Sequence, residues 1–297
     1  MGPVRFAVLG PGGVGGLLAA LLTRAGDSVV VLAGDSTART IAKEGIRVES
    51  QRFGDFTALV TTASQLSEPV DAVLVTVKAT QLDDALTRTP ASVTGDGLVI
   101  PFLNGLEHAD RLRSRYPPDR VVPAAIRIET TKIAPGIISQ TSPFAIVDIG
   151  PRGASVADHL RAAGLDVRIR DDEAAMLWDK FALLAPMALL TTHARANVGT
   201  IRRERRDDLV ALVEEAVATA RAEGVEIDPG GILRVIDIAP EAFETSMQRD
   251  QAAGRALELD ALGGALLRRA ERAGVETPVT RRLVEEIQAR SAPSRSS

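Results

Sequence analysis

Residues 4–18 read Val-Arg-Phe-Ala-Val-Leu-Gly-Pro-Gly-Gly-Val-Gly-Gly-Leu-Leu, an apolar strand followed by a glycine-rich turn and an apolar helix. In a dinucleotide-binding turn of this kind, the first glycine allows a tight turn and the second lets the backbone approach a pyrophosphate. The third lets the helix pack closely on the strand. The helix N-terminus then offers free N–H groups to the anion. Glycines also occur in plain turns, but the flanking strand and helix favour a nucleotide site. The predicted pyrophosphate contacts are Gly10, Gly12, Gly13, Val14 and Gly15.

Length and composition limit the classes of protein to be considered. A chain of 297 residues exceeds the usual size of one hydrophobic core, so two domains are expected. The net charge of −4 and the pI near 5.6 provide no general attraction to nucleic acid or to an anionic membrane. No apolar run reaches the ~18 residues of a membrane span, and we interpret the nearest, residues 181–190, as core. The absence of cysteine and the three scattered histidines argue against a metal site, and the former fits a reducing cytoplasm.

The first half of the chain has the pattern of an α/β domain. Short apolar runs alternate with polar or helical stretches, which predicts a parallel sheet with helices on both faces. The pattern then changes at residues 126–149 to β-rich segments, for which we expect a partly antiparallel extension of that sheet. The predicted strands after the first are 28–32, 58–60, 72–77, 98–102, 121–125 and, as the last, 167–169.

Beyond residue 171 the pattern is almost wholly helical. The predicted helices are 173–193, with Pro186 as a kink or break, then 205–223, 230–238, 245–273 and 280–290. The sequence therefore predicts a Rossmann nucleotide-binding domain over residues 1–170 and an all-α domain over residues 171–290. Residues 291–297, rich in serine and proline, are predicted to be a disordered tail. Long apolar helices in the second domain also favour a homodimer formed through it.

The end of the second strand bears on the choice of nicotinamide cofactor. NAD-binding versions of this fold carry an Asp or Glu there that binds the adenosine ribose, whereas this chain has Ala33. The missing carboxylate favours NADP, whose 2′-phosphate would be bound by Ser36 and Arg39, although Asp35 opposes this. The alternative interpretation makes Ser36 part of a helix cap and Arg39 a surface residue.

Three further segments form a joint pattern with the glycine turn: residues 75–81 (Val-Thr-Val-Lys-Ala-Thr-Gln), 102–106 (Phe-Leu-Asn-Gly-Leu) and 177–181 (Leu-Trp-Asp-Lys-Phe). Together with residues 258–260 (Glu-Leu-Asp), this pattern resembles the ketopantoate reductase family over nearly the whole chain. The resemblance implies reduction of 2-dehydropantoate to pantoate with NADPH, a step of pantothenate biosynthesis. It also implies a Rossmann domain followed by a helical one.

Lys78 and Asn104 follow the predicted strands 72–77 and 98–102, and ligands bind outside the carboxyl ends of such strands. The resemblance implies that Lys78 contacts cofactor and substrate, and that Asn104 binds the nicotinamide and substrate region. A plain turn at Asn104-Gly105 is the alternative.

Lys180 lies on the same predicted helical stripe as Leu177 and Leu184. Desolvation there would lower its pKa toward that of a general acid. A lysine that extends to solvent is the alternative. The resemblance implies catalysis, because the family's catalytic lysine has the same Trp-x-Lys pattern and donates a proton to the 2-oxo oxygen.

Ser246, Asp250, Gly254 and Glu258 recur every four residues, which predicts that they share one face of a single late helix. A solvent-facing polar stripe is the common explanation for such a pattern. The resemblance implies that Ser246 holds the substrate carboxylate. It also implies that Glu258 acts with the lysine and the substrate hydroxyl, next to the cofactor.

The chain departs from the family at Leu184 and Ala188, where asparagines are usual, so a more apolar pocket is expected. Asn197 is the candidate for a replacement polar contact with substrate. The leading hypothesis is a cytoplasmic, NADPH-dependent reductase of a small 2-oxo acid, first of all 2-dehydropantoate. The alternatives are a reductase of a less polar 2-oxo acid such as 2-oxoisovalerate, and a non-catalytic NADP-binding regulator.

Overall fold

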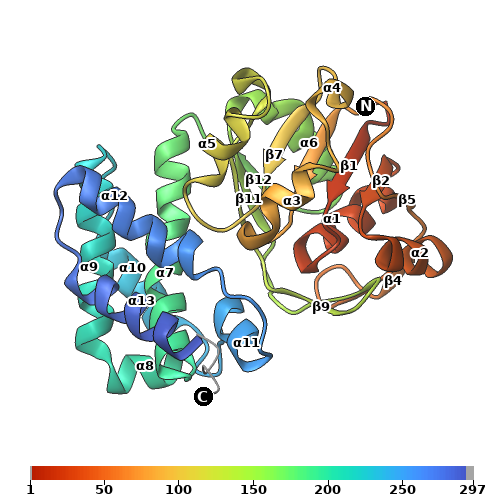
Figure 1. Ribbon diagram of the computed structural model, residues 1–297. Helices are drawn as coiled ribbons and strands as arrows, with labels where there is room; N and C mark the ends of the chain where they lie inside the picture. Colours follow the sequence, from red (N-terminus) through yellow and green to blue (C-terminus); the bar gives the residue numbers. More distant parts are fainter. Residues whose placement is uncertain (1, 292–297) are drawn as a thin grey trace, which may run out of the picture. The chain divides into compact units, whose positions relative to one another are not determined.

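The computed structural model describes residues 2–291, and the chain divides into two compact units (Figure 1). The N-terminal unit comprises residues up to Leu103 and His108–Met176, and the helical unit comprises Asn104–Glu107 and the chain from Leu177. The predicted boundary near residue 170 did not anticipate that Asn104–Glu107 belong to the helical unit. Of the tail predicted over residues 291–297, Ser291 ends a helix and the remainder lies outside the described residues.

A five-stranded sheet forms the centre of the N-terminal unit, in the order β5-β2-β1-β6-β7, with every pair parallel. Along β1, Phe6 and Val8 belong to one hydrophobic cluster and Ala7 and Leu9 to another, all four fully buried. A parallel sheet covered on both faces requires such apolar strands. The strands are β1 (Arg5–Leu9), β2 (Ser28–Leu32), β5 (Thr61–Ala63), β6 (Ala72–Val75) and β7 (Leu98–Pro101).

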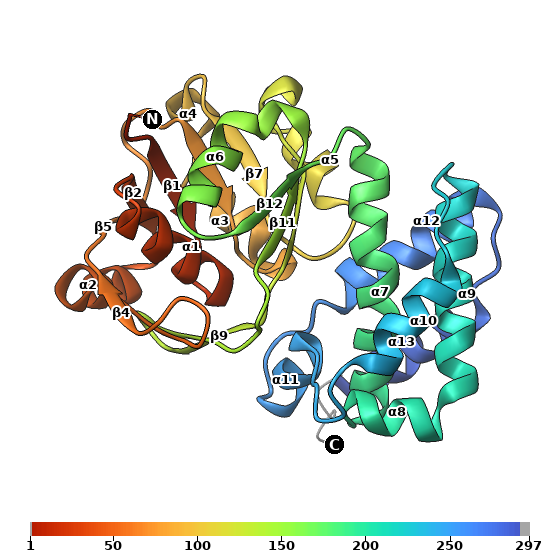
Figure 2. The ribbon, with the colours of Figure 1, turned by 180° about the vertical axis from the view of Figure 1, so that it is seen from behind.

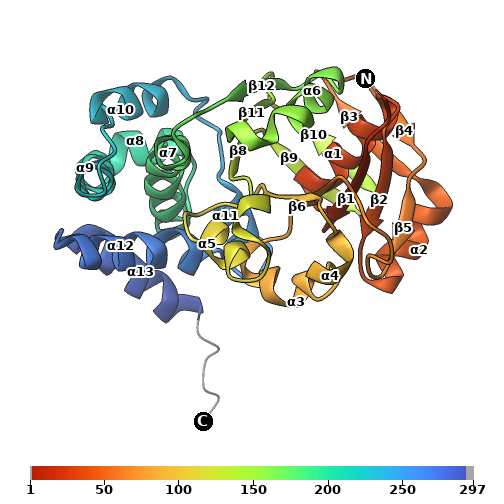
Figure 3. The same cartoon turned by 90° about the horizontal axis from the view of Figure 1, so that it is seen from above.

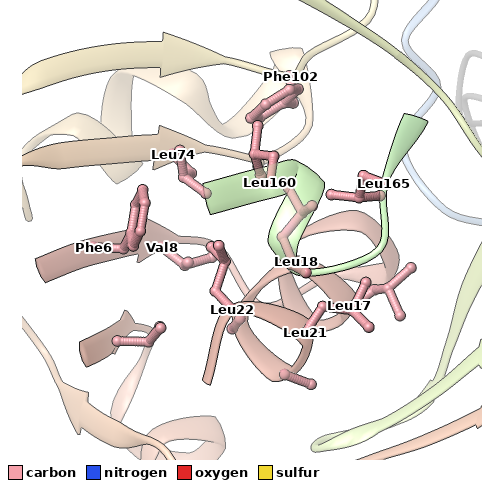
Figure 4. Packing of buried hydrophobic residues seen from close by; sticks show 14 of the residues in the cluster. Phe6, Val8, Leu17, Leu18, Leu21, Leu22, Leu74, Phe102, Leu160 and Leu165 are labelled. Atoms are coloured by element: carbon pink, nitrogen blue, oxygen red, sulfur yellow. The ribbon is translucent and has the colours of Figure 1, made fainter. Parts of the chain in front are cut away.

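Helices cover both faces of this sheet. On one face, α1 (Gly13–Arg24) and α6 (Ala154–Ala162) pack their leucines against β1 and β6 (Figure 4). Burying one such leucine stabilises the fold by about 1.5–3 kcal/mol. On the other face lie α3 (Leu82–Leu86) and α5 (His108–Arg113). The remaining short helices are α2 (Asp35–Glu44), α4 (Ala91–Thr94), η1 (Ala79–Gln81), η2 (Pro118–Arg120) and η3 (Pro151–Gly153).

The expected antiparallel extension of the first sheet is wrong, because residues 126–149 contribute to two separate sheets. The edge of β7 is bonded only briefly: Val122 N–H donates to Val99 O at 3.0 Å, and Pro123 has no N–H with which to continue. The second sheet, on which α1 packs (Figure 3), contains β4 (Phe56–Ala58), β3 (Ile46–Ser50), β10 (Ile137–Gln140) and β9 (Thr130–Ala134). The third contains β12 (Asp166–Ile169), β11 (Ile146–Ile149) and β8 (Ala124–Arg127).

The third sheet lies beside α6 (Figure 2), and ion pairs to one buried carboxylate join its three strands. Asp148 on β11 is fully buried and accepts hydrogen bonds from Arg127 on β8 and from Arg168 on β12. Burial alone would raise the pKa of Asp148, but the two guanidiniums outweigh it and hold the pKa below its usual range. One carboxylate therefore binds a guanidinium on each neighbouring strand.

The helical unit is built around α7 (Glu173–Ala194), which begins in the N-terminal unit and runs without interruption through Pro186, where the sequence suggested a kink or break. By length and composition α7 is the one helix of the described residues that is apolar enough to cross a membrane. However, 61% of that window is buried inside the protein, as in a core helix. The helices that follow are α8 (Val198–Glu204), α9 (Arg206–Ala222), α10 (Pro229–Ile238), α11 (Ser246–Ala252), α12 (Ala265–Ala273) and α13 (Pro278–Ser291).

The single late helix predicted over residues 245–273 is wrong. After α11 the chain leaves the helix at Gly254, whose φ of +63° is a left-handed conformation that favours glycine, and Arg255 N–H bonds back to Asp250 O at 2.8 Å. Helical structure resumes only after Glu258, with a π-helical turn at Asp260–Gly264 that leads into α12. Ser246 and Glu258 therefore do not share a helix face. The predicted Rossmann domain followed by a helical domain is confirmed.

Candidate active site

The glycine turn is held by tight contacts with the start of the segment after β6. Gly10 has a φ of +92°, and a Cβ there would lie 2.4 Å from Val77 Cγ1. A Cβ on Gly15 would lie 2.2 Å from Thr76 Oγ1 and 2.3 Å from Gly10 O. Thr76 Oγ1 is within hydrogen-bonding distance of Leu9 O (2.9 Å) and Gly10 O (2.8 Å). The first and third glycines thus allow the turn and the close approach of α1, and Thr76, which the sequence analysis did not single out, fastens the turn.

The N-terminus of α1 fits a nucleotide phosphate. No side chain caps this helix at Gly12, and its first turn, which includes Gly13 and Val14, carries no acidic residue. The Cβ position of Gly12 is open, with no heavy atom within 4 Å, whereas a Cβ on Gly13 would meet the Thr130 backbone at 3.0 Å. Free N–H groups at the positive end of a helix attract anions. A pyrophosphate could approach the backbone through this open space, and a side chain at position 12 would block that approach.

The end of β2 adjoins this turn, because Gly10 N–H donates to Leu32 O at 3.1 Å. Ala33 follows and is buried, so no carboxylate occupies the position at which NAD-binding relatives of this fold hold the ribose. Ser36 and Arg39 lie on α2 and are exposed to solvent. Their predicted contact with a 2′-phosphate stays a prediction.

Lys78 lies three positions beyond the end of β6, at the carboxyl end of the sheet, and immediately precedes η1. Its side chain is half-buried. This is the edge of a parallel sheet at which ligands bind, as the sequence analysis expected.

In the helical unit, the structure brings together two of the predicted residues. The Asn104 side-chain amide donates from Nδ2 to Glu258 Oε2 at 3.2 Å, although 154 positions separate them in the chain. Glu258 is 6% exposed. Gly105 allows this approach: it has a φ of +103°, and a Cβ there would lie 2.7 Å from Ala261 O. The turn that the sequence offered as an alternative at Asn104-Gly105 therefore coexists with a contact to Glu258.

Two arginines of α12 hold the segment that carries Asn104. Arg268 donates to Glu107 from Nε (3.1 Å) and Nη2 (2.6 Å), and from Nη1 to Asp260 (2.7 Å). Arg269 Nη2 donates to Leu106 O at 3.2 Å. The hydrogen bond from Arg268 is the main reason that the pKa of Glu107 lies below its usual range. The sequence did not reveal the contacts among Glu107, Arg268 and Arg269, because only the fold brings these residues together.

Lys180 is half-buried on α7, as are Leu177 and Leu184, so the predicted stripe exists. The tryptophan of the Trp-x-Lys pattern has a structural role. Trp178 is buried, donates from Nε1 to Glu223 Oε2 at 3.0 Å and packs edge to face on Phe181. It thereby fixes the turn of α7 that carries Lys180.

The remaining predicted substrate contacts lie elsewhere in the helical unit. Ser246 is exposed and begins α11, which is fastened to α7 by a hydrogen bond of 2.9 Å between the Thr191 and Thr245 hydroxyls. Asn197 Oδ1 caps α8, accepting from Thr200 N–H and Oγ1 at 3.0 Å each, so its oxygen has a structural partner. Within residues 2–291, no three histidine, aspartate or glutamate side chains gather as metal ligands.

Comparison with known proteins covers both units. Residues 6–154 match the family model of ketopantoate reductase PanE/ApbA, and residues 173–291 match that of its C-terminal domain. The chain is 32% identical over 299 residues to the 2-dehydropantoate 2-reductase of Caulobacter vibrioides (96% of this chain, 98% of that one). It is also 32% identical over 302 residues to the enzyme of that name from Mycobacterium tuberculosis (96% and 97%).

Solved structures agree with these matches. A PanE/ApbA family ketopantoate reductase from Ralstonia eutropha superposes with a TM-score of 0.89 at 29% identity, over 96% of this chain and 97% of that one. A D-mandelate dehydrogenase in complex with NADH and anilino(oxo)acetate shares the fold, with a TM-score of 0.89 at 21% identity over 97% and 98% of the two chains.

Proposed function

Because this chain belongs to the ketopantoate reductase family, as its matches to both family models establish, we propose that it reduces 2-dehydropantoate to pantoate with NADPH. The observation that carries the proposal is the Asn104–Glu258 hydrogen bond, which joins two residues that the family resemblance assigns to the site. The open, uncapped N-terminus of α1 supports a dinucleotide as the cofactor.

The N-terminal unit would hold the cofactor through the backbone N–H groups of Gly13 and Val14 and through Lys78. When bound, the nicotinamide supplies the hydride that the 2-oxo carbon accepts. Lys180 would donate a proton from its ammonium to the carbonyl oxygen, which becomes the hydroxyl of the product. Glu258 would orient that lysine and the hydroxyl, while Ser246 would hold the substrate carboxylate.

A less polar 2-oxo acid is the second candidate substrate. Leu184, half-buried on α7 one turn after Lys180, and the buried Ala188 supply no polar group at positions where the family resemblance calls for asparagine. Fewer polar partners would favour a substrate that lacks the hydroxyl of 2-dehydropantoate, such as 2-oxoisovalerate.

The experiment is a panel of 2-oxo acids assayed with NADPH and with NADH, followed by the loss of nicotinamide absorbance. Turnover of 2-dehydropantoate with the highest kcat/KM supports the proposal. A higher kcat/KM for 2-oxoisovalerate favours the second candidate. No turnover across the panel, with cofactor binding retained, refutes both and favours a nucleotide-binding regulator.

Lys180→Ala tests the proton donor, because the substitution removes the ammonium. We expect kcat to fall by about 10²–10⁴-fold, the usual contribution of general acid catalysis, with little change in the dissociation constant for NADPH. Lys43→Ala is the matched control, since Lys43 is an exposed lysine of α2. An equal loss in kcat and cofactor affinity, or an equal effect of both substitutions, would show that Lys180 has a structural role.

A further inference from the structure

An arginine from another part of the chain reaches the end of β2. There Ala33 takes the place of the carboxylate that binds the adenosine ribose in NAD-binding versions of the fold. Arg88 follows α3 and donates from Nη1 to Ser64 O at 2.7 Å and to Ala33 O at 3.3 Å. Its Nη2 lies 4.0 Å from the position that a Cβ on Gly34 would occupy. The guanidinium therefore borders the same corner as Ala33 and Gly34, without filling it.

The backbone fixes Arg88 in this place. Arg88 N–H donates to Ala85 O at 2.9 Å, and Leu66 N–H donates to Arg88 O at 2.8 Å. Its side chain is half-buried, and its hydrogen bonds to the Ser64 and Ala33 carbonyls hold the guanidinium in this conformation. A cation held in advance loses little entropy when an anion binds.

The charge of Arg88 is not compensated by any carboxylate of the described residues. Its hydrogen-bond acceptors are neutral carbonyls, whereas Arg127, for example, pairs with the carboxylate of Asp148. The adjacent N-terminus of α2 adds to the positive potential, because no side chain caps it at Gly34. Asp35 is the acidic residue in the first turn of α2, and because it is exposed, solvent and salt screen its repulsion of an anion.

Extending the NADPH-dependent function proposed above, we propose that Arg88 binds the 2′-phosphate of the cofactor and sets its preference over NADH. A guanidinium can form two parallel hydrogen bonds with a phosphate, and Arg88 Nη2 faces the open corner beside Gly34. The phosphate would thus be bound from the loop after α3. This differs from the sequence interpretation, in which Ser36 and Arg39 on α2 serve this purpose.

Dissociation constants for NADPH, NADH and 2′,5′-ADP test the proposal on the full chain. Arg88→Met should weaken binding of NADPH and 2′,5′-ADP by about ten- to hundredfold, the value of hydrogen bonds to a charged group. Binding of NADH, which has no 2′-phosphate, should stay within about twofold. Arg88→Lys keeps the positive charge but cannot form two parallel hydrogen bonds with the phosphate, so it should retain part of the preference for NADPH over NADH.

Arg39→Met and Arg115→Met are the comparison variants. The first removes the cation that the sequence favoured, and the second removes an exposed arginine of the same unit. Arg115→Met should not change the NADPH to NADH ratio, and Arg39→Met should change it less than Arg88→Met does. Preference for NADPH that persists in Arg88→Met, or that disappears in Arg39→Met, overturns the assignment to Arg88.

Two further outcomes separate this inference from the proposed function. Equal weakening of NADPH and NADH in Arg88→Met would mean that Arg88 only supports the loop, which overturns the inference and leaves the function intact. A wild-type protein without any preference for NADPH refutes the cofactor part of the proposed function itself.

Discussion

Removing the charge of Glu107 should loosen the segment that carries Asn104. In Glu107→Gln the amide oxygen can still accept one hydrogen bond from Arg268, but the ionic attraction is lost. Hydrogen bonds to charged groups contribute about 1.5–3 kcal/mol, and exposed ion pairs about 0.2–1 kcal/mol. Glu107 is 29% and Arg268 41% exposed, so solvent screens the pair partly. We therefore expect a loss of about 1 kcal/mol.

Trp178 reports this loss directly, because it is the sole tryptophan of the chain and lies buried in the helical unit. For an m-value of about 1–3 kcal/mol per molar urea, the fluorescence midpoint should fall by about 0.3–1 M. Glu271→Gln, an exposed glutamate of α12, serves as the control and should leave the midpoint unchanged. The kcat/KM for the 2-oxo acid should fall as well, since Glu107 fixes the segment of Asn104.

The pH dependence gives an independent check. The pKa of Glu107 is lowered in the folded protein, mainly by the hydrogen bond from Arg268. Its stabilising contribution is therefore complete above the unfolded value of about 4.3 and is lost as the pH falls through the lower folded value. The difference between the wild type and Glu107→Gln should persist from pH 7 to about pH 5 and shrink below about pH 4. Equal midpoints at pH 7, or a difference that does not shrink in acid, would refute this reasoning.

Two predictions concern the N-terminal unit. Gly12→Ala should leave the melting temperature unchanged, because the added Cβ meets open space, but it should weaken NADPH binding about tenfold, because the Cβ blocks the approach of the pyrophosphate. Gly15→Ala should lower both the melting temperature and the affinity for NADPH, since its Cβ would lie 2.2 Å from Thr76 Oγ1. Equal melting temperatures for the two variants would contradict this. Asp148→Asn should lower the free energy of unfolding by about 2–3 kcal/mol, somewhat less than a fully buried pair because Arg168 is 56% exposed. Calorimetry at pH 7 measures this loss, and an unchanged transition would argue against a stabilising role for Asp148.

The elements that the sequence predicted correctly are those whose pattern is local. The run over residues 28–32 coincides with β2, since apolar, β-branched residues between a glycine turn and a polar segment have few alternatives to a buried strand. Likewise α10 begins at Pro229, one residue before its predicted start at Gly230, with Asp228 as its cap. In both cases neighbours in sequence decide the structure.

The late helix was predicted wrongly because a spacing of four residues was read as one helix face. Ser246 and Glu258 fit that spacing, but a single glycine with positive φ between them interrupts the helix. Gly254 is a common type of residue at a helix end and costs about 1 kcal/mol in a helix interior, so it favoured a break that the four-residue spacing did not indicate. The roles assigned to Ser246 and Glu258 did not depend on a shared face, since they came from the family resemblance.

Contacts between distant parts of the chain explain what periodicity could not predict. Asn104 lies three positions after the end of β7, yet it belongs to the helical unit, in which Arg268 and Arg269, more than 150 positions away in the chain, bind Glu107 and the Leu106 carbonyl. The position of Asn104 beside Glu258 therefore depends on α12 as well as on its own strand. A substitution that destabilises α12 should thus lower activity even without touching cofactor or substrate, as other misplacements of reacting groups do.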